Sequence, residues 1–176
     1  MKKIIFLFFL LNNTFLFSQT FNKTVGIYST ELDQKELRGK SHQAKAVLNT
    51  NTGLLTVTDN LSAIKLDDLK FDTLNKNENP IFFKFETTIQ KNISIILKEN
   101  QNSNLIRIEG TITINGISRE SVALWSPIQL ITTSNTILID FEIKFLCEDF
   151  NLADLKFPFT NLVEFEIEDG ILNKVE

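Results

Sequence analysis

Residues able to carry out acid–base or nucleophilic chemistry are scarce in this chain of 176 residues, which has one histidine, His42, and one cysteine, Cys147. A Ser-His-Asp or Cys-His site needs a histidine base beside a nucleophile. His42 lies in the basic and polar segment RGKSHQAK, which carries no nucleophile motif. One histidine and one cysteine also cannot supply an ordinary zinc site. We therefore predict no catalytic residues and no metal site, and we expect His42 to face solvent.

Paired carboxylates are the remaining catalytic candidates, because two acids can together cleave a glycosidic bond. Glu164, Glu166 and Glu168 stand two residues apart in the segment LVEFEIEDGIL. In a strand this spacing places the three side chains on one face, opposite the apolar residues between them. A solvated strand face is the favoured interpretation. The chain also has no calcium loop, phosphate loop or dinucleotide fingerprint, so we expect no cofactor.

The elements that would position these residues are mostly strands, because apolar and polar residues alternate along much of the chain. The stretch IRIEGTITINGIS alternates from Ile106 and turns at Asn115-Gly116, a pair that suits the positive φ angles of a type I′ hairpin. Two short strands are expected in AKAVLNTNTGLLTVTD, around a turn rich in Asn, Thr and Gly. The other predicted strands are IFFKFETTI, ISIILK, TILIDFEIKFLC and LVEFEIEDGIL.

One segment, SAIKLDDLKFDTLN, breaks the two-residue rhythm, and its apolar residues approach helical spacing. Asn60 or Ser62 could cap a helix there, and two aspartates sit early in the segment. We predict one helix near 62–75. Antiparallel strands with one apolar face each favour a lipocalin-like β-barrel of about eight strands over an open sheet, because closure removes exposed edges.

The apolar faces of these strands point into the predicted barrel, where they form either a filled core or the wall of a ligand cavity. Both structures require the same alternation, so the pattern does not separate them. The candidates for lining a cavity are Phe83, Phe85, Ile95, Ile108, Ile112, Ile114, Ile139, Phe141, Ile143, Phe145, Phe165 and Ile167.

The first residues, MKKIIFLFFLLNNTFLFSQ, are typical of a secretory signal peptide, with two lysines, an apolar run and a small residue near the end. We predict a signal peptide over 1–19, one domain over 20–176, and a periplasmic or secreted protein without a stable membrane anchor. The formal net charge of −4 argues against nucleic acid as a partner. The lone cysteine cannot form an internal disulfide, and Cys147 is expected to be a small core residue.

The aromatic composition favours an apolar ligand over a sugar. The chain has 16 Phe but one Trp and one Tyr. Phenylalanine offers apolar area without a hydrogen-bonding group. Most of these rings are expected simply to build the core.

Four segments, in order, resemble the YceI-like family. They are LDQKELRGKSHQAKAVLNTNTGLL, NENPIFFKF with Pro80, IEGTITINGISRES with Gly110, Thr111, Thr113, Ile114 and Gly116, and LCEDFNLADLKFP with Asp149 and Phe150. The resemblance implies an exported protein with a lipocalin-like barrel that binds a polyisoprenoid lipid. The chain departs from the family at Asn79, where a tyrosine is usual, at Asn151, where a glycine is usual, and in LDDLKFDTLNKN, which lacks a histidine.

Three hypotheses follow for function. The first is an exported carrier or buffer of an apolar, isoprenoid-like lipid, whose head group would meet polar residues at a strand end, with Lys40, Ser41 and His42 as candidates. The second is a non-catalytic structural or interaction module with a filled core. Its outward apolar residues are then covered by the 62–75 helix or form a partner or homodimer surface, and they are Phe82, Ile96, Leu138 and Leu146. The third is an enzyme with an unrecognised carboxylate site.

Overall fold

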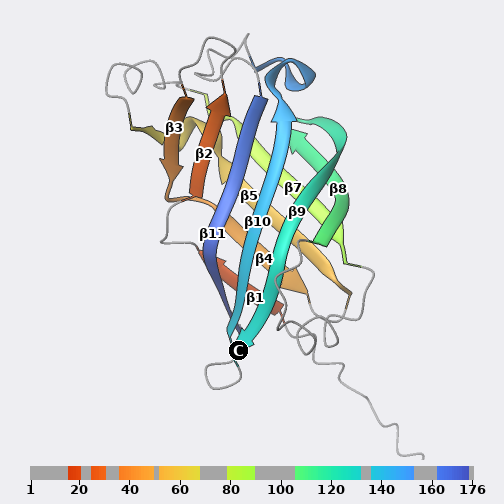
Figure 1. The fold of residues 1–176 in the computed structure, drawn as a ribbon. Helices are drawn as coiled ribbons and strands as arrows, with labels where there is room; N and C mark the ends of the chain where they lie inside the picture. Colours follow the sequence, from red (N-terminus) through yellow and green to blue (C-terminus); the bar gives the residue numbers. More distant parts are fainter. Residues whose placement is uncertain are drawn as a thin grey trace, which may run out of the picture.

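A computed structural model describes residues 16–20, 25–30, 36–49, 52–67, 79–89, 106–131, 136–152 and 162–174. Within these ranges the chain forms strands and two short 3₁₀ helices (Figure 1). The strands are β1 (Leu16–Thr20), β2 (Val25–Thr30), β3 (Glu36–Ser41), β4 (Lys45–Asn49), β5 (Leu54–Asn60), β6 (Lys65–Leu66), β7 (Phe82–Thr88), β8 (Ile106–Ile114), β9 (Ile117–Ile131), β10 (Thr136–Leu146) and β11 (Leu162–Lys174). The 3₁₀ helices are η1 (Leu61–Ala63) and η2 (Cys147–Phe150).

The described strands form one antiparallel sheet, in the order β1-β4-β5-β7-β8-β9-β10-β11-β2-β3-β6. β1 also pairs with β11, through Phe17 opposite Lys174 and Ser18 opposite Asn173. In Figure 1 the strands β9, β10 and β11 lie in front of β4, β5 and β7. The sheet therefore curls so that its two sides face each other across an interior. This arrangement confirms the predicted mostly β, antiparallel architecture.

The hairpin between β8 and β9 confirms the turn predicted at Asn115-Gly116. Their φ angles are 46° and 85°, both in the left-handed region that a type I′ turn requires. The turn is also tied to β7, because the backbone N–H of Asn115 donates to the carbonyl oxygen of Phe82 at 3.1 Å. In return, the backbone N–H of Phe82 donates to Oδ1 of Asn115 at 2.9 Å. The asparagine thus serves both the turn and the sheet.

The helix predicted near 62–75 is wrong in its described part. Residues 61–67 form the 3₁₀ turn η1 and the two-residue strand β6, while residues 68–75 lie outside the described residues. Asn60 caps η1 as predicted, since its side chain accepts the backbone N–H of Ser62 at 3.1 Å. The turn stops at Ile64, which is extended. Ser62 Oγ accepts the backbone N–H of Ile81 at 2.9 Å, a tertiary contact that outweighs the weak helical spacing.

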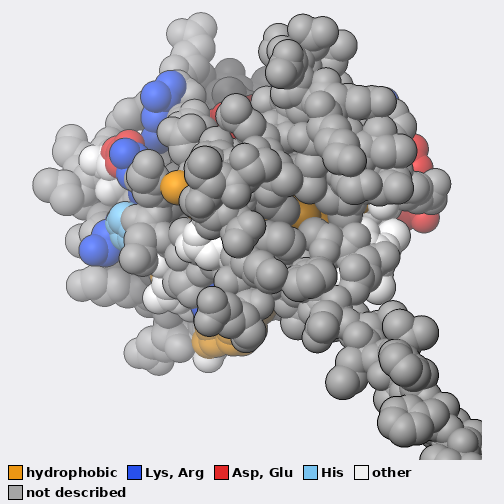
Figure 2. All heavy atoms as spheres, turned by 90° about the horizontal axis from the view of Figure 1, so that it is seen from below, with side chains coloured by type: hydrophobic (Ala, Val, Ile, Leu, Met, Phe, Trp, Pro, Cys, Tyr) orange, Lys and Arg blue, Asp and Glu red, His pale blue; other side chains and the backbone are white. Residues whose placement is uncertain are grey.

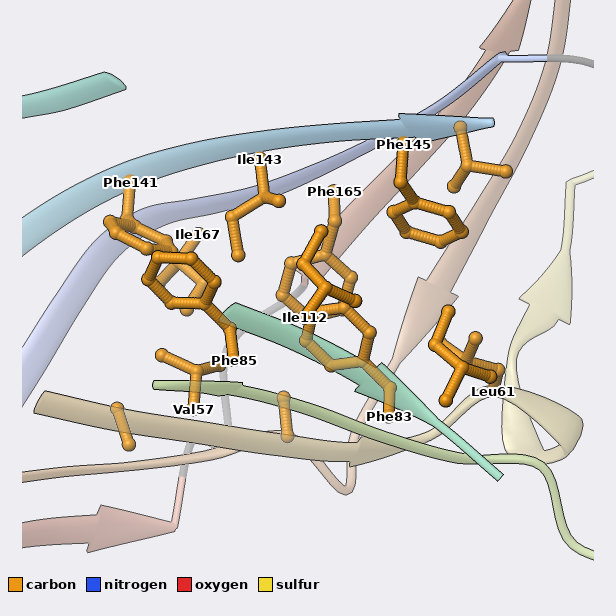
Figure 3. Close-up of a cluster of buried hydrophobic side chains, with 14 of the residues drawn as sticks. Val57, Leu61, Phe83, Phe85, Ile112, Phe141, Ile143, Phe145, Phe165 and Ile167 are labelled. Carbon is orange, nitrogen blue, oxygen red and sulfur yellow. The ribbon is translucent and has the colours of Figure 1, made fainter. Parts of the chain in front are cut away.

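A cluster of buried apolar side chains lies between the two sides of the sheet (Figure 3). Alternation along each strand places these residues inward. On β10 the side chains of Phe141, Ile143 and Phe145 are buried, whereas Lys144 between them is exposed. In Figure 3 the labelled residues of β10 point toward β7, and Phe141 lies beside Phe85 of that strand. Apolar packing and strand pairing therefore hold the described fold together.

The predicted signal peptide overlaps a strand. Residues 1–15 lie outside the described residues, but Leu16 to Gln19 make up most of β1. Signal-peptide cleavage stays a prediction. In the described ranges, no helix has both the length and the apolar character needed to cross a membrane.

Candidate functional site

The predicted lining residues converge on the interior. Ile95 lies outside the described residues, and Ile139 is described only in its backbone on β10. The others are all buried, namely Phe83, Phe85, Ile108, Ile112, Ile114, Phe141, Ile143, Phe145, Phe165 and Ile167. Burial is required of a core residue and of a cavity wall alike, so their role toward a ligand stays a prediction.

Aromatic rings from opposite sides of the sheet stack on one another in the interior. The rings of Phe83 on β7 and Phe165 on β11 have centroids 4.7 Å apart and lie nearly parallel. These strands are separated by β8, β9 and β10 in the sheet order, so the contact joins opposite sides. Phe83 also stacks on Phe145 at 6.0 Å, and Phe85 meets Phe141 at 5.1 Å. Side chains therefore occupy the interior between β7 and the β10–β11 pair.

Gly110 makes room for one of these rings. A Cβ atom at this position of β8 would lie 2.5 Å from Cζ of Phe85 and 2.6 Å from the carbonyl oxygen of Glu86. Real Cβ atoms do not approach other atoms so closely. The absent side chain lets the Phe85 ring lie over the backbone of β8, and the same ring reaches Phe141 on β10. This packing gives a physical reason for the glycine in the resembling segment IEGTITINGISRES.

Asp59 is a carboxyl in the row of buried residues on β5, after Leu55 and Val57. Its side chain is only 5% exposed. Oδ1 accepts Ser41 Oγ–H at 2.7 Å and the backbone N–H of Asn60 at 2.7 Å. Oδ2 has no hydrogen-bond partner among the described residues. Burial raises the pKa of this carboxyl above its ordinary value of 3.8, although the hydrogen bonds from Ser41 and Asn60 act in the opposite direction.

The three residues predicted to meet the head group of a ligand have different environments. Ser41 is buried at the end of β3, and its hydroxyl binds Asp59. Lys40 and His42 are exposed, as expected for His42. Figure 2 shows a histidine side chain, pale blue, at the surface beside blue Lys or Arg side chains. His42 lines a hollow of about 510 Å³ that Asp59 also lines. Sequence reasoning missed Asp59, although a charged residue that follows Leu55 and Val57 at the same two-residue spacing was a detectable signal.

Glu164, the first residue of the carboxylate row on β11, forms an ion pair with the neighbouring strand. Glu164 lies opposite Lys144 of β10, and the carboxylate is 3.1 Å from the Lys144 ammonium group. Lys144 also contacts Glu142 at 2.9 Å. Hydrogen bonds to Glu142 and Glu164 raise the pKa of the lysine. Glu166 is partly buried, and the side chain of Glu168 lies outside the described residues. Glu164 thus takes part in a cross-strand ion pair.

Cys147 is buried at the start of η2, and burial raises the pKa of its thiol to about 12. At neutral pH the sulfur therefore stays protonated and weakly nucleophilic. Among the described residues, no group of His, Cys, Asp and Glu side chains could hold a metal ion.

Asp59→Asn is expected to raise the free energy of unfolding at neutral pH by roughly 1 kcal/mol, because an amide costs less to bury than a carboxylate. The unfolded chain loses the Asp59 proton near its ordinary pKa of 3.8, whereas the folded chain holds it to higher pH. The stability that this group contributes therefore falls as pH rises through the folded-state pKa. The gain from Asp59→Asn should grow over the same window.

Urea unfolding of both proteins across a pH series measures that difference. Asp67→Asn, which removes one exposed carboxylate, corrects for the change in net charge. A gain that stayed constant from acidic to neutral pH would show that burial of the charge is not its cause.

These features define a curled antiparallel β fold that has an apolar interior and, among the described residues, one buried carboxyl. The sequence matches no family model. No curated protein matches it either. Among solved structures, the chain is similar to a polyisoprenoid-binding domain from Saccharophagus degradans, implicated in plant cell wall breakdown. The TM-score is 0.61 at 10% sequence identity, and the match covers 92% of this chain and 99% of that domain. The predicted likeness to polyisoprenoid-binding proteins is thus confirmed at the level of the fold.

Proposed function

We propose that this protein is a non-enzymatic lipid-binding protein that holds a polyisoprenoid or a similar long apolar chain inside the curled sheet. The observation that carries the proposal is the enclosed apolar interior on the fold of a polyisoprenoid-binding domain. Such a chain needs no directional contacts along its length. Its transfer from water contributes about 25 cal/mol for each Å² of apolar surface removed.

A closed lipocalin-like barrel is the finer form of this fold that we propose. The pairings of β1 with β4 and with β11 support it, because they join the two ends of the run from β4 to β11. The stacked rings of Phe83 and Phe165 occupy part of the enclosed space. A bound chain would therefore pass alongside these rings or displace them.

Export to the periplasm or out of the cell is the second part of the proposal, and the leader-like sequence of residues 1–19 supports it. Cleavage after Gln19 would remove most of β1, so processing there and closure through β1 are alternatives for the same residues. Intact-mass measurement of the protein recovered from a bacterial host distinguishes them. A chain that begins at Thr20 would favour processing, and an intact chain would favour closure.

Native mass spectrometry of the protein purified from a bacterial host tests the lipid proposal. We expect an adduct with the mass of a quinone or polyprenyl lipid, which organic extraction should release for identification. The extracted protein should rebind such a lipid and melt at a higher temperature with it, because a ligand of the folded state stabilises that state. A protein that is free of lipid when purified and stays free after incubation would contradict the proposal. That result would favour an interaction module with a filled core.

Exposed apolar side chains are the observation that favours this second function. Phe82 is 62% exposed as predicted, and Leu146 and Leu54 are also exposed. Ile96 lies outside the described residues, and the side chain of Leu138 is not described. Light scattering tests a homodimer through this surface. A mass that halves in Phe82→Ser would support it, whereas a monomer at all concentrations would exclude it.

A further inference from the structure

The unpartnered oxygen of Asp59 marks a place where a hydrogen-bonding group of another molecule fits. Buried polar atoms in proteins are almost always hydrogen-bonded. In Asp59, however, both donors reach Oδ1, and Oδ2 has no partner among the described residues. The side chain lies beside an apolar neighbour, because Asp59 is directly opposite Phe83 in the pairing of β5 with β7. A carboxyl in this position bears a desolvation cost that a bound polar group would reduce.

The Asp59 carboxyl faces the interior of the curled sheet, because it follows Leu55 and Val57 in the row of buried residues on β5. Its cross-strand neighbour Phe83 is buried there as well and stacks on Phe165. The hollow of about 510 Å³ lies along the same strands, and its lining also includes the exposed residues Lys45 and Phe82. The interior therefore offers an apolar surface and one unpartnered polar atom together, which matches a molecule with a long apolar chain and one polar end.

The chemistry of Asp59 favours an uncharged hydroxyl as that polar end. An ionised carboxylate accepts a hydrogen bond, and a protonated carboxyl can also donate one. A hydroxyl group does both, so it suits Asp59 in either protonation state. A phosphate would bring negative charge next to an ionisable carboxyl.

We propose that Asp59 binds the hydroxyl end of the apolar ligand, so that the preferred ligand is a long-chain alcohol of the prenyl type. This inference rests on the proposed lipid-binding function and names the polar end that it recognises. Ser41 acts as a positioning residue, since its hydroxyl holds Oδ1 and leaves Oδ2 for the ligand.

The inference is tested by the binding of three probes that share the same hydrocarbon chain. The probes are geranylgeraniol, the hydrocarbon without its hydroxyl, and geranylgeranyl monophosphate, each added to the extracted full-length protein. We expect Asp59→Leu to weaken binding of the alcohol about tenfold, the size of one hydrogen bond, and to leave binding of the hydrocarbon unchanged. Ser41→Ala tests the positioning role, because it removes the donor to Oδ1 but keeps Oδ2. It should weaken binding of the alcohol by less than Asp59→Leu does and leave binding of the hydrocarbon unchanged. Asp67→Asn, which removes an exposed carboxylate, is the matched control and should bind all three probes as the wild-type protein does.

The double variant Ser41→Ala, Asp59→Leu provides a second test if Asp59→Leu alone does not fold. It replaces both hydrogen-bonding partners by apolar groups, which leaves no buried hydroxyl donor unpaired. The expected loss of alcohol binding is the same.

Equal alcohol affinity in the wild-type and Asp59→Leu proteins would overturn the assignment of Asp59, while binding of the hydrocarbon would leave the proposed function standing. Tighter binding of the phosphate than of the alcohol would overturn the choice of a hydroxyl. If the wild-type protein bound none of the three probes, the proposed function itself would fail.

Discussion

Phe83→Ala is expected to lower the free energy of unfolding by about 3–5 kcal/mol, the usual cost of removing a buried aromatic ring. The Phe83 side chain is 1% exposed and stacks on Phe165 at 4.7 Å and on Phe145 at 6.0 Å. Its removal takes apolar contacts from both sides of the curled sheet at once. Because the neighbouring rings are held by their own strands, they cannot close the space fully. Urea unfolding followed by circular dichroism measures the change.

Phe82→Ala is the matched control for this experiment. It also removes a phenyl ring, from the adjacent residue of the same strand, but Phe82 is 62% exposed. The expected change is about 0.5 kcal/mol or less, as for most surface substitutions. Similar losses of unfolding free energy in the two variants would contradict the observation that Phe83 faces the interior and Phe82 faces solvent. A small loss in Phe83→Ala alone would mean that the rings do not pack across the interior as described.

The cavity left by Phe83→Ala also bears on ligand binding. If a bound chain passes alongside the Phe83 and Phe165 rings, the variant should keep its lipid adduct in native mass spectrometry. A filled-core interaction module would instead lose stability without any lipid being bound. The stability and the adduct therefore report on separate properties of the same residue.

Gly110→Ala is expected to destabilise the protein by about 1–3 kcal/mol, the usual range for overpacking. The added methyl group would lie 2.5 Å from the Phe85 ring and 2.6 Å from the carbonyl oxygen of Glu86. The ring could move only by giving up its contact with Phe141, whereas the backbone carbonyl could move only with β7 itself. Thermal or urea unfolding of the variant gives the magnitude.

Two further variants separate the causes of that loss. Gly116→Ala has no atom within 4 Å of the new methyl group, but its φ of +85° is strained for alanine. It therefore reports backbone strain without steric overlap. Phe85→Leu, combined with Gly110→Ala, removes the ring from the overlap. A coupling energy near zero in this double-mutant cycle would show that the ring is not what Gly110 accommodates.

Local patterns in the sequence predicted much of the sheet. Asn115-Gly116 has the positive φ angles that its turn requires. The alternation in TILIDFEIKFLC correctly separated buried Phe141 and Phe145 from exposed Lys144. These properties depend on neighbouring residues, because a strand presents alternate side chains to opposite faces whatever it packs against.

The prediction of a helix near 62–75 was wrong in its described part because the structure there depends on contacts outside that segment. Its apolar spacing was only approximate, and such weak propensity yields to tertiary contacts. Ser62 is held by Asn79 and Ile81, which lie 17 and 19 residues further along the chain. No pattern within residues 62–75 contains those partners.

The sequence by itself determined that this chain forms an antiparallel β fold with an apolar face on each strand and a scarcity of catalytic groups. Only the tertiary structure decided which inward residues meet, such as Phe83 with Phe165, and which inward polar residue lacks a partner. Those contacts join strands far apart in the chain, so their geometry follows from how the sheet curls. Asp59 illustrates the difference, because its position was visible in the alternation of β5 but its free oxygen emerged only from the packing around Ser41.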